Sequence, residues 1–391
     1  MVAAVSEHHC SSFFAVGMQR ERHQTIRNSR GQPDSIRPAC LPWKTLMARS
    51  FRSAARPGGT TPMLIAAAVA AASSALWVQH RAKKAEQDNP PFGQFIEVDG
   101  VRLHYVDEGD GAPVVLLHGN TVQLQDFYAS GLIERLAVNH RVIAFDRPGF
   151  GYSERPRRRL WTPQAQAALM QRALRKMGIA QPVVLGHSWG ALVALAMAID
   201  DPGYVRGLVL VSGYYFPTAA RVDVALTAPA AIPVLGDVLR YTASPLAGRL
   251  LLGRTAKAMF SPMPTPNQFF DLMPRDILLR PRQMRAEAED AVFMVPAVAD
   301  FRGRYATLEV PVCIIAGERD KIVDPVAHSV RLHQELPHAA LLVVPGAGHM
   351  VHYSFPRVLD EAIRVMTRDR STPASPSVGE AVRVDRDCLK P

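Results

Sequence analysis

The sequence has 391 residues, of which 48% are hydrophobic and 20% charged, and this excludes both a single small module and a disordered chain. Its four cysteines are far apart and include no CxxC pair, so neither a disulfide framework nor a structural zinc site is expected. The net charge is +10, but residues 1–61 hold nine Lys/Arg against three acidic residues; the rest of the chain is nearly neutral, which argues against nucleic-acid binding.

The N-terminal part divides into three segments. Residues 1–61 are basic and show no sustained apolar period, which predicts a disordered region, and Met47 offers an alternative start within it. Residues 62–79 are apolar and predict either a membrane anchor or the hydrophobic part of a signal peptide. Residues 80–93 are polar and are expected to form a linker.

The apolar segment is ambiguous between these two membrane-related roles, and a helix of the soluble protein is a third alternative. From Met63 to Val78 it has 16 uncharged residues, rich in alanine, and as a helix these span about 24 Å, less than a hydrocarbon core of about 30 Å. Trp77 and the basic residues that follow favour an uncleaved anchor. Small residues near the end of the run fit a cleaved signal peptide, which leaves export as the alternative.

From residue 94 onwards, strand-like and helical patterns alternate. Two runs around Asp99-Gly100 predict a β-hairpin. Short Val/Ile/Leu-rich runs between helices then predict a mostly parallel sheet covered on both faces, a doubly wound α/β core made of residues 94–217 and 306–370. The predicted strands are 94–98, 101–106, 113–117, 141–145, 182–185, 207–211, 310–316 and 340–344, and the predicted helices are 127–138, 163–178, 189–200, 325–335 and 356–368.

The alternation is interrupted after the sixth strand. Residues 218–305 contain no strand-like run and include apolar helical stretches separated by prolines. An insertion after a strand of an open sheet is expected over the carboxyl ends of the strands, where ligands bind, so we predict a helical lid. The polar residues 371–391 are expected to be a disordered tail.

The segment Gly186-His187-Ser188-Trp189-Gly190 matches G-x-S-x-G. It follows an apolar strand and precedes a helix, which is the context that a nucleophile elbow needs. The glycines permit a sharp turn, and the helix N-terminus favours an anionic intermediate. We therefore predict that Ser188 is a nucleophile.

A serine nucleophile needs a base and an orienting acid, which follow it in the order acid and then histidine. Asp320 comes after one apolar strand, and His349 comes after the next. We predict Asp320 as the acid and His349 as the base. Glu318 and Asp324 are the alternative acids, and His352 is the alternative base.

Upstream, His118-Gly119-Asn120 follows another apolar strand. A loop in this position supplies one backbone N–H to an oxyanion hole, and the residue after the nucleophile supplies the second. The predicted donors are the backbone N–H groups of Asn120 and Trp189. His118 is expected to be a hydrogen-bonding residue rather than a base.

With these motifs the sequence resembles the α/β-hydrolase superfamily, in its lidded, serine-nucleophile, esterase-like branch. The resemblance is carried by HGN, DRPGFGYS, GHSWG, GERD and GAGH, and it covers residues 94–368. It implies a catalytic triad of Ser188, Asp320 and His349, and a cap domain that corresponds to the helical insertion.

The serine narrows the chemistry that the resemblance implies. Dehalogenase and epoxide hydrolase branches use an aspartate nucleophile, so Ser188 favours hydrolysis of a carboxylic ester or related acyl bond through an acyl-enzyme. Carbon–carbon bond hydrolases and cofactor-free perhydrolases, which are haloperoxidase-like, remain alternatives with the same residues. A slow-turnover ligand-binding receptor of the same fold is an alternative of another class.

The lid composition predicts a small, largely apolar substrate. The pocket candidates are His118, His187, Phe260, Phe269 and Phe270, and Met259, Met263 and Met273 could line the same pocket. The phenylalanines and methionines fit the lid's own core equally well. No metal-ligand cluster, dinucleotide fingerprint or P-loop is present in the sequence, so neither a cofactor nor a bound metal is expected.

Overall fold

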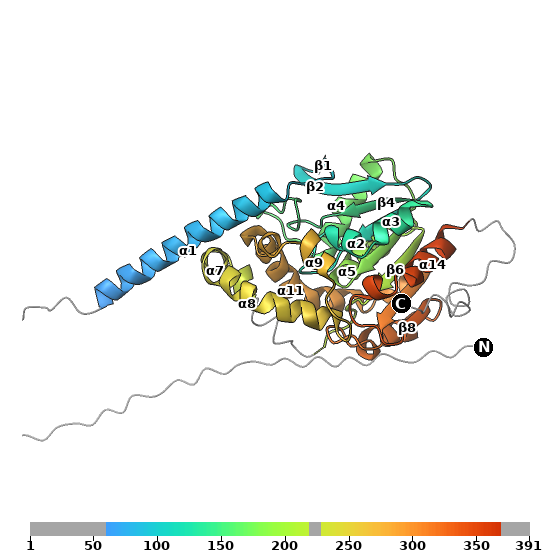
Figure 1. Ribbon diagram of the computed structural model, residues 1–391. Coiled ribbons are helices and arrows are strands. Elements are labelled where there is room, and N and C mark those ends of the chain that lie inside the picture. The colour runs from blue at the N-terminus through green and yellow to red at the C-terminus, as the bar shows by residue number, and fades with distance from the viewer. Residues whose placement is uncertain (1–59, 219–227, 369–391) are drawn as a thin grey trace, which may run out of the picture. The chain divides into compact units, whose positions relative to one another are not determined.

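The computed structural model describes residues 60–218 and 228–368, and within these ranges eight strands form one sheet (Figure 1). The strand order is β1-β2-β4-β3-β5-β6-β7-β8. Pairs β1–β2 and β2–β4 are antiparallel, and all other neighbours are parallel. The strands are β1 (Gln94–Val98), β2 (Val101–Glu108), β3 (Ala112–Leu117), β4 (His140–Phe145), β5 (Val183–His187), β6 (Gly207–Val211), β7 (Val312–Gly317) and β8 (Ala340–Val344).

Helices cover both faces of this sheet, which confirms the predicted doubly wound fold. Successive residues of β3 alternate between two apolar clusters: Val115 and Leu117 pack with α4 and α5, and Val114 and Leu116 pack with α3 and α14. This alternation follows from the two-residue period of a strand. The helices of the core are α2 (Gln125–Ala129), α3 (Leu132–Ala137), α4 (Pro163–Lys176), α5 (Trp189–Asp200), α12 (Arg331–Glu335), α13 (Val351–Ser354) and α14 (Pro356–Thr367).

Two of the predicted helices are subdivided. The helix expected at 127–138 is two helices, α2 and α3, because the chain turns at Gly131, whose φ of 69° ends the first helix. The helix expected at 325–335 begins as the π-helical turn η3 (Val326–Val330) and continues as α12.

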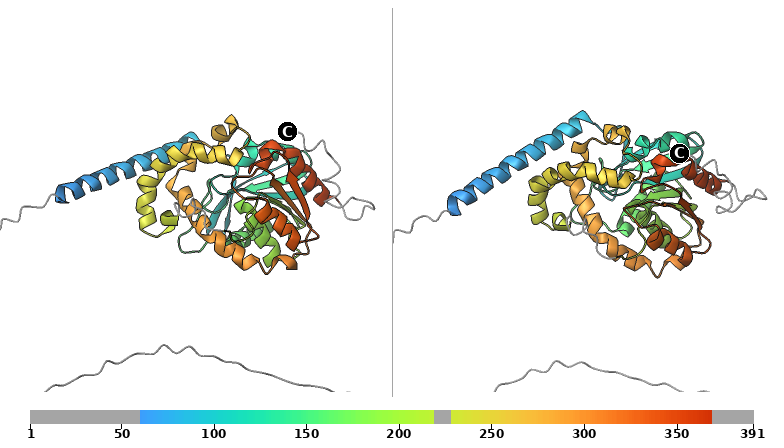
Figure 2. Two further views of the ribbon diagram at one scale, coloured as in Figure 1. Left: turned by 90° about the horizontal axis from the view of Figure 1, so that it is seen from below. Right: turned by 60° about the horizontal axis from the view of Figure 1, so that its bottom comes forward.

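Helices occupy the described part of the insertion between β6 and β7. They lie together beside the sheet in the views of Figure 2, where they are yellow to orange. The elements are η1 (Ala228–Ala231), α7 (Leu235–Tyr241), α8 (Ala243–Phe260), α9 (Asn267–Leu272), α10 (Arg275–Leu278), α11 (Pro281–Phe301) and η2 (Tyr305–Thr307). We refer to residues 228–307 as the helical insertion; residues 219–227 of the predicted lid lie outside the described residues.

The apolar N-terminal segment belongs to one long helix, α1 (Thr60–Asp88), which corrects the expected linker at 80–93. Residues 80–88 are helical, and Asn89 ends the helix by donating from its backbone and side-chain nitrogens to the Ala85 carbonyl, at 3.0 and 2.9 Å. Prolines 90 and 91 cannot continue a helix, so only residues 89–93 connect α1 to the sheet.

The two halves of α1 have different surroundings. In the C-terminal half, Arg81 pairs with Asp276, and Glu86 accepts from Arg280 at 3.0 Å, so this half is held against the insertion. The N-terminal half projects beyond the insertion (Figures 1 and 2), and Met63 and Leu64 are exposed there. Within the described chain, α1 alone is long and apolar enough to cross a membrane. The predicted disordered tail, and the predicted N-terminal region up to residue 59, lie outside the described residues.

Candidate active site

Ser188 stands on the turn between β5 and α5, at the carboxyl end of the sheet. Its φ of 53° and ψ of −117° are unusual for a residue with a side chain, and such strained backbone is typical of functional turns. The turn depends on its glycines: a Cβ on Gly190 would come within 2.1 Å of the Leu117 carbonyl oxygen, and one on Gly186 within 2.4 Å of the Gly190 carbonyl oxygen. The G-x-S-x-G pattern therefore permits the close contact that presents Ser188.

Asp320 and His349 lie together at the ends of β7 and β8. The Nδ1 atom of His349 is 2.7 Å from Oδ2 of Asp320, and both side chains are buried. The other carboxylate oxygen, Oδ1, accepts from the backbone N–H groups of Ile322 and Val323 at 2.7 and 2.9 Å. The carboxylate is therefore fixed from one side while it orients the imidazole from the other.

The alternative acids have other partners. Glu318 is exposed and accepts from the backbone N–H of Gly346 at 3.0 Å. Asp324 accepts from the backbone N–H groups of Val326 and Ala327 at 2.8 and 2.9 Å, as a residue at the start of a helical turn does. Neither interaction involves His349.

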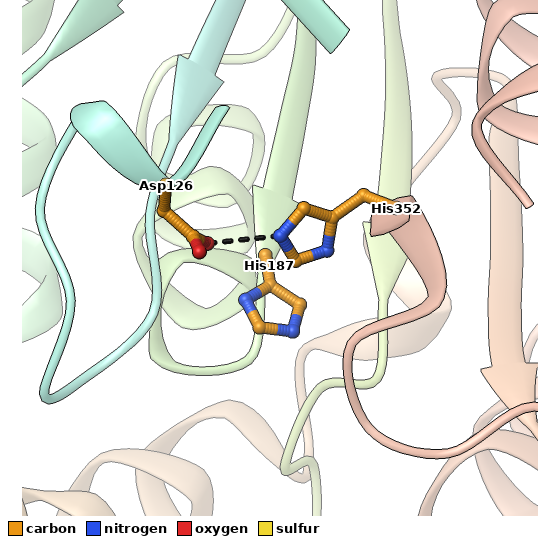
Figure 3. Close-up of side chains that lie close together, drawn as sticks. All are labelled: Asp126, His187 and His352. Atoms are coloured by element: carbon orange, nitrogen blue, oxygen red, sulfur yellow. Dashed lines mark hydrogen bonds and ion pairs between the residues drawn. The ribbon is translucent and has the colours of Figure 1, made fainter. Parts of the chain in front are cut away.

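The alternative base His352 belongs to a buried group behind the nucleophile. Figure 3 shows His352 facing Asp126 with His187 beside them, and the His352 Nε2 to Asp126 Oδ2 distance is 2.9 Å. The potential ligand atoms of these three residues lie within 4.8 Å of one another. Tyr353 also donates to Asp126 at 2.9 Å, and His187 Nε2 donates to the His349 carbonyl at 3.2 Å, so hydrogen bonds tie this group to the base's loop.

The loop that carries Asn120 is held firmly beside the nucleophile. Arg147 donates to the carbonyl oxygens of His118 and Gly119 at 2.8 and 3.0 Å, and the Asn120 side chain donates to the Glu287 carbonyl at 3.2 Å. Trp189 is the first residue of α5, where a backbone N–H has no intrahelical acceptor. The two predicted oxyanion donors thus come from a braced loop and from a helix N-terminus.

A cavity of about 330 Å³ opens at this site, between the sheet and the helical insertion. Ser188 and His349 both line it, together with Asn120 and Trp189. The remaining lining residues are mostly apolar and are Thr121, Tyr214, Gly248, Leu251, Leu252, Thr255, Met259, Leu278, Leu279, Met284, Glu287, Ala291, Met294, Ile322 and Val323. The cavity therefore joins the predicted nucleophile and base to a largely apolar chamber.

Met259 lines this cavity as expected, whereas the predicted histidines and phenylalanines do not, which is a difference from the sequence-based expectation. Phe260 and Phe269 are buried in the insertion's apolar cluster, with ring centroids 5.2 Å apart, and Phe270 packs against them. His118 and His187 are buried beneath the site. The apolar cluster that these aromatic residues fill also contains Val122 and Met350, so it joins the insertion to the α/β core.

His118 is held in one neutral form. Its Nε2 accepts from the Arg147 backbone N–H at 2.9 Å, and its Nδ1 donates to the Gly119 carbonyl at 2.7 Å. Burial, reinforced by the Arg147 charge, lowers the pKa of His118 to about 3. Its place in the loop network agrees with the expected hydrogen-bonding role.

Residues of α11 line the cavity but were not expected from the sequence. Met284, Glu287, Ala291 and Met294 are spaced by three, four and three positions, so they share one face of the helix. This periodicity is visible in the sequence, although nothing in it shows which face of the helix meets the nucleophile.

Residues 112–356 match the model of the protein family described as alpha/beta hydrolase fold. The chain therefore belongs to this family and is an enzyme of it. The 2-hydroxymuconate semialdehyde hydrolase of Pseudomonas putida is 30% identical over 290 residues, which cover 68% of this chain and 90% of that protein. Haloalkane dehalogenase 2 of Mycobacterium tuberculosis is 27% identical over 272 residues, with 67% and 90% covered.

Solved structures agree on the fold. A thermophilic esterase from Thermogutta terrifontis superposes with a TM-score of 0.57 at 23% identity, covering 70% of this chain and 97% of the esterase. At this identity the likeness shows the fold alone.

Proposed function

We propose that the protein hydrolyses a carboxylic ester, or a related acyl bond, of a small and largely apolar substrate. The proposed nucleophile is Ser188, the base is His349 and the orienting acid is Asp320. The observation that carries the proposal is the cavity that Ser188 and His349 both line, with His349 Nδ1 2.7 Å from Asp320 Oδ2.

In the proposed mechanism, His349 removes the proton of Ser188 as its oxygen attacks the substrate carbonyl carbon. The resulting oxyanion is bound by the backbone N–H groups of Asn120 and Trp189. His349 then protonates the leaving alcohol, which departs and leaves an acyl group on the serine. Water, deprotonated by the same histidine, hydrolyses this acyl-enzyme and restores Ser188.

Asp320 acts through the histidine. Its carboxylate holds Nδ1–H, so that Nε2 is the atom left to exchange the proton, and it stabilises the imidazolium that forms. The two backbone N–H groups that bind Oδ1 keep the carboxylate in this orientation.

Carbon–carbon bond hydrolysis is the second candidate, because the Pseudomonas putida relative is named for the hydrolysis of 2-hydroxymuconate semialdehyde. Dehalogenation is disfavoured despite the mycobacterial relative, since alkyl transfer requires a carboxylate nucleophile and this chain has Ser188.

The test is a comparison of substrates with the full-length chain in detergent. Turnover of p-nitrophenyl esters from acetyl to lauroyl is measured beside 2-hydroxymuconate semialdehyde, with Ser188→Ala as the matched control. Serine-dependent ester turnover supports the proposal, and the preferred acyl-chain length indicates how long a chain the cavity accommodates. Turnover of the semialdehyde alone would favour the second candidate, and binding without turnover of either would favour a receptor.

We further propose that α1 anchors the enzyme in a membrane. Beside the exposed N-terminal half of α1, the insertion carries exposed large apolar residues on or beside η1, α7 and α8, and α1 packs against α7. These residues are Ile232, Val234, Leu235, Val238, Leu246, Leu250 and Leu251. Such a concentration of exposed apolar side chains beside a candidate membrane helix fits contact with a bilayer.

Membrane fractionation with alkaline carbonate extraction tests the anchor. A protein that retains residues 63–78 and resists extraction supports it. A processed, extractable form that starts near Leu76 would instead favour a signal peptide.

A further inference from the structure

Three residues that line the cavity each carry a buried polar atom without a hydrogen-bond partner within the described residues. These atoms are Asn120 Oδ1, Trp189 Nε1 and Glu287 Oε1. Buried polar atoms are nearly always paired. Since all three residues line one chamber beside Ser188, a polar group on the substrate is a reasonable partner for them.

Glu287 is the unusual member, because its carboxyl forms no ion pair within the described residues. The Arg147 guanidinium acts on it electrostatically, but the hydrogen bonds of Arg147 go to the His118, Gly119, Gln166 and Asp290 oxygens. A second buried arginine, Arg155, pairs with Asp290 at 3.0 Å and with Glu289 at 2.7 Å.

The neighbouring ion pairs do not include Glu287. Asp290 pairs with Arg147 and Arg155. Glu289 pairs with Arg155 and Arg285. An ionised Glu287 would therefore lie beside an apolar cavity without an ion-pair partner among the described residues. Burying an unpaired charge is far more costly than burying a neutral acid.

The protonation of Glu287 agrees with this cost. Burial raises the pKa of its carboxyl to about 8, and the Asp290 carboxylate adds to the rise, while the Gln283 amide and Arg147 act in the opposite direction. At pH 7 the group is mainly a neutral acid, with an O–H to donate.

We propose that Glu287 is a specificity-determining residue whose protonated carboxyl donates a hydrogen bond to an acceptor oxygen on the substrate's acyl chain. The Trp189 indole N–H is a second donor in the same cavity, and these two donors call for an acceptor oxygen on the substrate. Asn120 Oδ1 accepts, and a hydroxyl on the acyl chain can both accept from the donors and donate to it. The preferred substrates are esters whose acyl chain carries an ether, hydroxyl or keto oxygen. This inference rests on the proposed ester hydrolysis.

The test exchanges a single methylene for oxygen. The kcat/KM of p-nitrophenyl hexanoate is compared with that of three analogues that have an ether oxygen at C3, C4 or C5 of the chain. For each analogue the readout is the ratio of its kcat/KM to that of the hexanoate. A general loss of activity cancels in this ratio, and the intrinsic reactivity of each ester cancels between variants.

Three variants accompany the wild type. Glu287→Leu removes the donor, Glu287→Gln keeps a neutral donor of similar shape, and Met294→Leu changes the apolar wall on the same helix. For at least one analogue we expect the ratio in Glu287→Leu to be about fivefold lower than in the wild type, which is the effect of losing one neutral hydrogen bond. In Glu287→Gln and Met294→Leu the ratio should stay within about twofold of the wild-type ratio. Thermal melting checks that each variant is folded.

The pH profile separates a proton donor from a shape effect. Ionisation above pH 8 removes the Glu287 O–H, so the wild-type ratio should fall as the pH rises through 8, whereas the Glu287→Gln ratio should stay level. His349 lines the same cavity, and both substrates of a ratio depend on it alike, so the ratio isolates the contribution of Glu287.

Ratios that are equal in the wild type and Glu287→Leu, with ester turnover intact, overturn this inference alone. Absence of Ser188-dependent turnover with every ester overturns the proposed function and this inference with it.

Discussion

The substitution Asp320→Asn isolates the charge of the acid from its structural role. Oδ1 of Asp320 accepts from two backbone N–H groups, so the asparagine must keep its oxygen there and turn its NH₂ group toward His349. An NH₂ group donates, and it therefore forces Nδ1 of His349 to accept. The proton moves to Nε2, and the histidine can no longer take a proton from Ser188.

The electrostatic part of the loss can be worked from the geometry. With Nδ1 and Oδ2 2.7 Å apart, the two charge centres of an imidazolium–carboxylate pair lie about 4 Å apart. At an effective dielectric constant of about 20 their attraction is about 4 kcal/mol. Losing it from the transition state lowers kcat about a thousandfold, and the altered tautomer adds to this.

The assay is steady-state hydrolysis of the best p-nitrophenyl ester, with Asp324→Asn as the matched control. Asp324 accepts two backbone N–H bonds of the same kind but has no recorded contact with His349, so its variant should keep kcat within about tenfold of wild type. A folded Asp320→Asn protein that also stays within tenfold would refute the assigned role of the acid.

Three further predictions follow. Ser188→Ala and His349→Ala should each reduce ester hydrolysis at least a thousandfold without changing the melting temperature by more than a few degrees; normal turnover in either variant would remove that residue from the mechanism. Gly190→Ala should destabilise the fold or prevent folding, because its Cβ would lie 2.1 Å from the Leu117 carbonyl oxygen, and unaltered melting would contradict this packing. Because the pKa of His118 is lowered to about 3, the unfolded chain binds the extra proton between pH 6.5 and 3. The free energy of unfolding should therefore fall by about 1.4 kcal/mol per pH unit below 6.5, and His118→Gln should lose this contribution in denaturant titrations.

The strands and the order of the elements were predictable from the sequence. Buried parallel strands consist of continuous apolar runs, and those at 207–211 and 340–344 have the predicted bounds. The break between α2 and α3 was missed because Gly131 interrupts an otherwise continuous helical pattern. The extent of α1 was missed because contacts with the insertion, such as that of Glu86 with Arg280, lie far apart in sequence.

The nucleophile, acid and base were selected by motif and strand-end position, and the structure brings Asp320 to His349 as that reasoning expects. The pocket residues were selected by residue type, which is a weaker guide. Phe260 and Phe269 are apolar and belong to the insertion, but they are buried in an apolar cluster and do not line the cavity. Glu287 drew no attention because only the tertiary structure shows a glutamate in an apolar cavity.

The central claim is that Ser188 is a nucleophile activated by His349. Brief exposure of the full-length protein to a fluorophosphonate, followed by intact-mass and peptide mass spectrometry, tests it most directly. The account predicts one phosphonyl adduct on the peptide that contains Ser188, strongly slowed in His349→Ala and absent in Ser188→Ala. An unlabelled wild-type protein, or equal labelling of Ser188→Ala, would contradict it.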